Sequence, residues 1–85
     1  MKIRGNDLLL QEIDGEVVIL DSLNGKLHKL NSVARHVWQG VAEGDNFDSI
    51  VDAICISFSD CERTQVEQDV GQCVQQLLEL GLVLP

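Results

Sequence analysis

The sequence predicts an α+β fold, similar to a winged helix, in which a three-stranded antiparallel sheet is followed by three helices. Three short β-type runs, separated by turn signals, lie within residues 1–30. From residue 31 onward, apolar residues recur with the three- and four-residue spacing of amphipathic helices. An 85-residue chain has room for one domain, which we expect to span residues 1–85.

The first two strands are predicted to form a hairpin. Residues 8–13 and 16–20 are β-type runs, and the Asp14-Gly15 pair between them is among the strongest short hairpin signals. The run 17–20 is apolar at every position, which is typical of a strand covered on one side by helices and partly shielded on the other.

A third strand is predicted at residues 26–30, after a turn at residues 21–25. The three strands then make a meander with the third strand at an exposed edge. We expect Lys26 and Lys29 on outward positions of that strand. Lysines there commonly protect an unpaired edge from aggregation, but they also occur where an extended peptide adds to a sheet. The sequence alone leaves both uses open.

The rest of the chain is predicted to form three helices. Asn31 or Ser32 is the expected N-cap of the first helix, and the break at 44–46 is expected to cap the second. Ser59–Glu62 is predicted to form a capping box at the start of the third helix, and Gly81 is its expected C-cap. The expected apolar faces are Val33, Ala34, Val37, Trp38 and Val41, then Phe47, Ile50, Val51, Ile54, Cys55 and Phe58, and finally Val66, Val70, Cys73, Val74 and Leu77.

Gly71 interrupts the third helix, where glycine costs roughly 1 kcal/mol relative to alanine. One explanation, which we favour, is tight packing against the protein's own helices. The other is close approach of a second backbone. Together with an open edge on the third strand, such a notch makes a peptide groove between strand and helix plausible.

The chain is acidic, and its charge is unevenly distributed. The net charge is −8, yet residues 1–41 hold five acidic and five basic side chains, so the whole excess lies in residues 42–85. Arg63 is the one base of that second part, and no carboxylate occurs between Asp21 and Glu43. Because DNA binding requires clustered lysines and arginines, the acidic third helix argues against a winged-helix DNA-binding regulator, and no nucleic-acid partner is expected.

No catalytic site, metal site or cofactor is predicted. His28 and His36 are eight residues apart, one on a strand and one on a helix, with no activated nucleophile nearby. Cys55, Cys61 and Cys73 match no zinc-binding spacing. The odd number of cysteines and the lack of a leader or a long apolar run favour a reducing, cytoplasmic compartment and no membrane partner.

Several short segments occur in an order that resembles a known family. They are residues 18–21 (Val-Ile-Leu-Asp), 24–26 (Asn-Gly-Lys), 30–31 (Leu-Asn), 37–38 (Val-Trp), 48–51 (Asp-Ser-Ile-Val), 69–70 (Asp-Val) and 77–83 (Leu-Leu-Glu-Leu-Gly-Leu-Val). In this order, from about residue 17 to residue 83, they resemble the PqqD-like domains. These domains are the leader-peptide recognition elements of pathways that modify ribosomally made peptides.

The resemblance implies a non-catalytic protein that binds the leader of a precursor peptide and presents it to a modifying enzyme or leader peptidase. It implies a lasso-peptide pathway or another pathway linked to a radical enzyme or a protease. The leader would add antiparallel to the third strand, in the cleft beside the third helix. Carried onto this sequence, the binding residues are Lys26, Leu27, His28, Lys29 and Leu30 on the strand, and Glu67, Val70, Gly71, Val74 and Leu78 on the helix.

The carboxylate-free segment adds one expectation about the peptide. We predict acidic leader residues near Lys26, Lys29 or Arg35, because these cations have no neighbouring acid in the sequence. A remaining alternative is a structural or dimerisation subunit that pairs with itself through the same strand edge.

Overall fold

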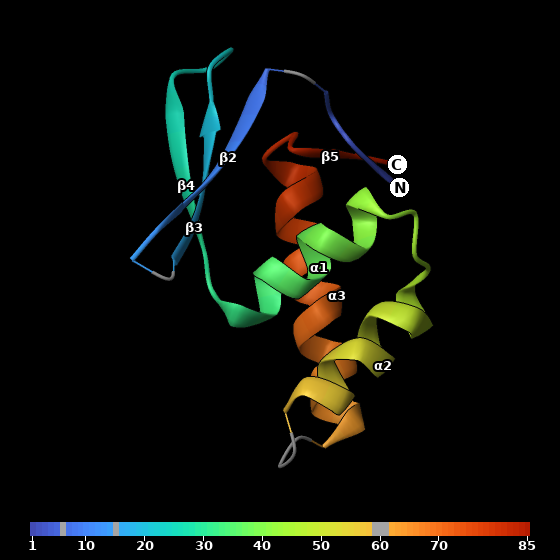
Figure 1. The fold of residues 1–85 in the computed structure, drawn as a ribbon. Coiled ribbons are helices and arrows are strands. Elements are labelled where there is room, and N and C mark those ends of the chain that lie inside the picture. Colours follow the sequence, from blue (N-terminus) through green and yellow to red (C-terminus); the bar gives the residue numbers. More distant parts are fainter. Residues whose placement is uncertain (6, 15, 59–61) are drawn as a thin grey trace.

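A three-stranded sheet stands beside a group of three helices in the computed structural model, which describes residues 1–5, 7–14, 16–58 and 62–85 (Figure 1). The α+β fold class predicted from the sequence is confirmed. The elements are β1 (Lys2–Ile3), β2 (Leu8–Ile13), β3 (Glu16–Asp21), β4 (Lys26–Leu30), α1 (Ser32–Ala42), α2 (Phe47–Ser57), α3 (Arg63–Glu79) and β5 (Val83–Leu84).

The sheet has the predicted meander order β2-β3-β4, which leaves β4 with one neighbouring strand. His28 pairs with Ile19 and Leu30 pairs with Val17, so these residues share the face that packs on the helices. Lys26 and Lys29 are both exposed. Being three residues apart, they lie on opposite faces of the strand: Lys29 is on the outward face as expected, whereas Lys26, although exposed, is on the face of His28 and Leu30, so the expectation is wrong for the face of Lys26.

The first two helices begin at the predicted caps. The Oδ1 atom of Asn31 accepts a hydrogen bond of 2.8 Å from the backbone N–H of Ala34, and that of Asn46 accepts one of 2.8 Å from Ser49. These side chains satisfy backbone donors that the first turn of a helix leaves without partners. Both helices therefore begin directly after the asparagine that caps them.

The third helix differs from the prediction at its start. It begins at Arg63, and Glu62 occupies the N-cap position without a side-chain capping bond, so the expected capping box is wrong at Glu62. Ser59, its predicted partner, lies outside the described residues. At the other end Gly81 has a φ of 73°, and the N–H of Leu82 donates to the carbonyl of Leu77 at 3.0 Å. This is the glycine-dependent helix ending that was predicted.

The apolar core lies where the inner face of β3 meets all three helices and the segment after α3. Gly40 of α1 is the tightest point: a Cβ there would lie 2.5 Å from Cγ1 of Ile50 in α2. A Cβ at Gly71 would meet nothing within 4 Å, so its interpretation as a tight-packing glycine is wrong. The core residues are Val17, Ile19, Leu30, Val37, Trp38, Val41, Ile50, Val51, Ile54, Val66, Val70, Leu77, Leu82 and Val83.

The two ends of the chain lie side by side as a two-stranded ribbon that the sequence did not predict (Figure 1). Lys2 pairs with Leu84 and Ile3 pairs with Val83, in antiparallel register. In the described part of the chain, no helix is both long and apolar enough to cross a membrane.

Candidate functional site

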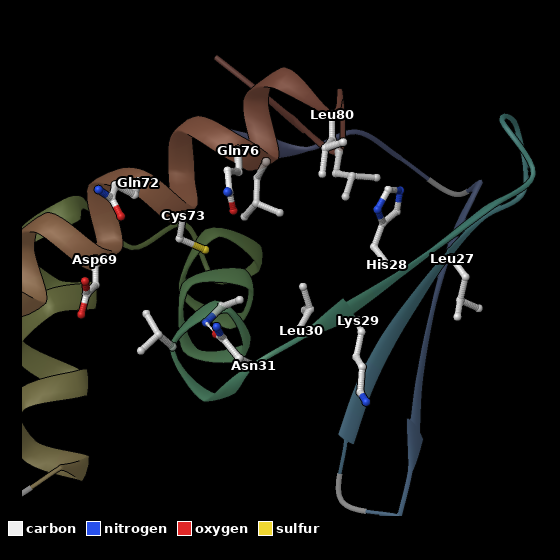
Figure 2. Close-up of a pocket in the computed structure, with 14 residues that line it drawn as sticks. Leu27, His28, Lys29, Leu30, Asn31, Asp69, Gln72, Cys73, Gln76 and Leu80 are labelled. Atoms are coloured by element: carbon white, nitrogen blue, oxygen red, sulfur yellow. Dashed lines mark hydrogen bonds between the residues drawn. The ribbon is translucent and has the colours of Figure 1, made fainter.

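A cleft of about 580 Å³ separates β4 from α3 (Figure 2). One wall is the strand and the other is a face of the helix, while α1 and the segment after α3 close its floor. Its lining residues are Leu27, His28, Lys29, Leu30, Asn31, Val33, Ala34, Asp69, Gln72, Cys73, Gln76, Leu77, Leu80 and Leu82.

The strand wall is an open sheet edge. β4 pairs with β3 on one side, and in the described chain no other strand or loop backbone pairs with it on the other. In an antiparallel strand, alternate residues direct N–H and C=O groups away from their one neighbour. β4 therefore presents a row of backbone donors and acceptors to the cleft, and such a row can bind an extended chain.

The helix wall is a single stripe along α3. Asp69, Gln72, Cys73, Gln76 and Leu80 are spaced by one, three or four residues, so they occupy one side of the helix. Figure 2 shows these side chains directed toward the space beside β4. Because the stripe mixes polar and apolar groups, it can contact a peptide without forming part of the core.

β4 and α3 run in opposite directions along the cleft, so the end of β4 lies beside the earlier part of the α3 stripe (Figure 2). Asp69 and Gln72 lie at the end near Asn31. His28 and Leu80 lie at the other end, where Leu82 adds to the lining. We call the end with Asp69 and Gln72, which Val33 and Ala34 also line, the polar end, and the end with Leu80, Leu82 and His28 the apolar end.

Two basic residues near β4, Lys29 and Arg35, form ion pairs with carboxylates of the protein itself. Nζ of Lys29 lies 2.8 Å from Oε2 of Glu16, and both side chains are more than half exposed. A guanidinium nitrogen of Arg35 lies 3.7 Å from a carboxylate oxygen of Glu12. No carboxylate of the described residues forms an ion pair with Lys26. Lys26 is therefore the strand cation most available to an acidic ligand.

Cys73 is the thiol that lines the cleft. Burial raises the pKa of the Cys73 thiol, because the surrounding apolar groups disfavour the thiolate. The neutral thiol acts here as a small apolar contact between the helix and the floor. Within the described residues, no three His, Cys, Asp or Glu side chains gather closely enough to hold a metal ion.

An ionic cluster joins the walls of the cleft at its apolar end. Nη2 of Arg4 lies 2.6 Å from Oδ1 of Asp21 and 2.8 Å from Oδ2 of Asp7, while Nη1 donates to the carbonyl of Gly81 at 3.3 Å. Hydrogen bonds from Arg4 and then from Asn24 hold the pKa of the Asp21 carboxyl well below its ordinary value. The cluster ties the turn before β4 to the end of α3, and so it sets the separation of the two walls at that end.

The structure brings four of the strand residues named from the sequence into the cleft: Leu27, His28, Lys29 and Leu30. Lys26 and Arg35 lie outside its lining. The helix residues named from the sequence are also elsewhere: Val70 is fully buried in the core, Val74 and Leu78 pack against the core, Glu67 accepts a hydrogen bond from Arg63, and Gly71 is not part of the lining.

The sequence interpretation missed the helix stripe and most of the floor. One signal in the sequence locates the core side of α3, although not which of its two flanks borders β4. Val66, Val70 and Leu77 mark the core side of α3, and the mixed polar and apolar positions next to it on the β4 side form the lining. The missed residues are Asn31, Val33, Ala34, Asp69, Gln72, Cys73, Gln76, Leu77, Leu80 and Leu82.

Comparisons with known proteins point to one kind of protein. The family model described as coenzyme PQQ synthesis protein D (PqqD) matches residues 16–83. The structure of TbiB1 in complex with the TbiA(beta) leader peptide has a TM-score of 0.83 and 32% sequence identity, covering 98% of this chain and 94% of that one. The structure of lasso peptide synthetase B1 complexed with the leader peptide has a TM-score of 0.82 and 27% identity, covering 95% of this chain and 94% of that one. No curated protein matches the chain.

Proposed function

The chain belongs to the PqqD family, and from that premise we propose that it is a leader-peptide recognition element. In this role it captures the leader of a precursor peptide and presents it to a modifying enzyme or a leader peptidase. Both solved relatives are complexes with a leader peptide, and both share the whole architecture of this chain.

The single observation that carries the proposal is the open edge of β4 facing the side-chain stripe of α3. A peptide that adds to β4 gains backbone hydrogen bonds, which depend little on its sequence. Its alternate side chains meet the helix wall, and those contacts provide selectivity. The leader would thus be held as a fourth strand, next to β4 and under α3.

We propose that the protein binds without catalysing a reaction. The cleft contains His28 and Cys73, but Cys73 is a partly buried thiol with a raised pKa. A nucleophile of this kind would need a lowered pKa or an adjacent base. The chemistry then belongs to the partner enzyme, in the cytoplasm, where precursor peptides are made.

The electrostatics of α3 disfavour the DNA-binding alternative. Arg63, the one base in residues 42–85, lies 2.5 Å from Asp52 and 3.2 Å from Glu67. The hydrogen bond to Asp52 is the main cause of its raised pKa. Since this cation is already paired with two acids, α3 has no free base with which to neutralise phosphates.

A titration with the TbiA(beta) leader peptide tests the proposal, with a matched pair of variants. Gln76 lines the cleft, whereas the neighbouring Gln75 is exposed and does not. We expect the unaltered protein to bind the peptide, Gln76→Trp to fill the cleft and weaken binding at least about tenfold, and Gln75→Trp to change it less than about twofold. Absence of binding to the unaltered protein, or equal effects of the two tryptophans, would contradict the proposal.

A further inference from the structure

The polar end of the cleft contains an acid whose charge the protein does not balance. Asp69 is the one carboxylate among the fourteen lining residues, and it is partly buried. It also borders a smaller hollow, whose other lining residues are Ser32, Val33, Ile54, Phe58, Glu62, Gln65 and Val66. Its Oδ1 accepts a hydrogen bond of 3.0 Å from the amide of Gln65, and no described residue donates to Oδ2.

The nearby cations are engaged elsewhere. Arg63 pairs with Asp52 and Glu67, and Lys29 pairs with Glu16. Figure 2 shows the Lys29 side chain pointing away from α3. A peptide lying in the cleft would remove further water from Asp69. Since an ionised carboxylate is costly to desolvate when one of its oxygens lacks a donor, a peptide that donates to Oδ2 of Asp69 is favoured over one that does not.

The distance from Asp69 to the apolar end of the cleft determines how far apart in the peptide the residues that contact the two ends must be. Leu80, the residue that caps the end of α3, lies eleven residues after Asp69, which corresponds to roughly 16 Å along the helix axis at 1.5 Å per residue. A β-strand covers that length in about five residues. Because strand side chains alternate between faces, residues that contact the same wall are two or four positions apart.

We propose that the cleft selects a strand with a lysine or arginine facing Asp69 and apolar residues two and four positions further along, toward Leu80. This inference rests on the proposed function and deepens it by naming the class of peptide. In a strand antiparallel to β4, the end near Asn31 receives the N-terminal part. The basic residue therefore precedes the apolar residues in the peptide sequence.

A charge-swap experiment tests the assignment. The TbiA(beta) leader peptide is prepared as two scans, with lysine or glutamate placed in turn at each position of the bound segment, and each peptide is titrated against the protein. At one position, lysine should tighten binding about fivefold or more and glutamate should weaken it to a similar extent. Asp69→Asn should remove both effects, and Asp69→Lys should invert them so that glutamate binds more tightly.

The control is Asp45→Asn, which removes the same charge from an exposed residue outside the cleft. It should leave both scans unchanged. Charge preferences that persist in Asp69→Asn, or that do not invert in Asp69→Lys, would overturn this inference while leaving the proposed function intact. Failure of every peptide to bind the unaltered protein would overturn the proposed function and this inference with it.

Discussion

Two glycines of this chain are surrounded by very different amounts of space. A methyl group at Gly40 would lie 2.5 Å from Cγ1 of Ile50, close to the base of a side chain that is itself buried. A methyl group at Gly71 would meet nothing within 4 Å. The same substitution at the two positions therefore separates the cost of overfilling the core from the intrinsic preference of helices for alanine.

We predict opposite effects of alanine at these two positions. Gly40→Ala should lower the free energy of unfolding by about 1 kcal/mol or more, because overpacking exceeds the gain in helix propensity. Gly71→Ala should raise it by about 0.5–1 kcal/mol, since the helix gains propensity without a clash. Urea unfolding of both variants measures the difference. An equal sign for the two changes would contradict the packing at Gly40.

A second prediction at this scale concerns the pH dependence of stability. Asp21 has a folded-state pKa below its ordinary value of 3.8, because Arg4 and Asn24 donate hydrogen bonds to its carboxylate. Its contribution to stability is therefore fully present above that ordinary value and is lost as the pH falls through the folded-state pKa.

Asp21→Asn should accordingly lower the melting temperature by several degrees at pH 7. The difference between variant and unaltered protein should narrow as the pH falls from 3.8 toward the lower folded-state pKa, because the unfolded chain binds the proton first and the folded protein loses the charge only at that lower pKa. Thermal melts followed by circular dichroism across this pH range provide the measurement. A difference that stays constant with pH would show that the carboxylate charge is not what stabilises the cluster.

Among the elements, the three strands of the sheet and the N-caps of α1 and α2 were predictable from the sequence, whereas the start and the orientation of α3 were not. Local turn and cap residues, such as Asn31 and Asn46, determine where elements start. Along α3, apolar residues occupy positions from Val66 to Leu78 over more than one side of the helix. Which side borders β4 depends on how the helix packs in three dimensions, so the sequence predicted the cleft but not its helix residues.

The charges of β4 give a prediction for a peptide with acidic residues beside the strand. Lys26 has no ion-pair partner among the described residues, whereas Lys29 already pairs with Glu16. Lys26→Glu should therefore weaken binding of such a peptide, and reduce its dependence on salt, more than Lys29→Glu does. Titrations at two ionic strengths compare the variants. If neither variant changed the affinity, the predicted attraction between Lys26 and an acidic peptide would be wrong.

At the scale of the whole molecule, the two ends of the chain are held together by the pairing of β1 with β5. The β1–β5 ribbon joins residues separated by nearly the full length of the chain, and its two-residue strands have no local sequence signal. This is why the sequence did not predict them. Within the ribbon, Val83 of β5 is 1% exposed, and the segment that follows β1 places Arg4 beside Asp21.

Removal of residues 1–4 should therefore destabilise the protein, because it exposes Val83 and leaves Asp21 without its cation. We expect a melting temperature lower by several degrees and a weaker affinity for the leader peptide, since the ends of β4 and α3 are no longer tied together. Calorimetry and a peptide titration on the truncated chain measure both. A truncated chain with unchanged stability would contradict the role of the ribbon and the cluster.

Amide hydrogen exchange tests strand addition most directly, because the sheet contains its own control. β2 and β4 are both edge strands of one sheet, and only β4 borders the cleft. On binding of the TbiA(beta) leader peptide, alternate amides of β4 should exchange at least about tenfold more slowly, while those of β2 stay unchanged. Protection of β2 instead, or no new protection of β4 when the peptide is bound, would contradict capture of the leader as a strand.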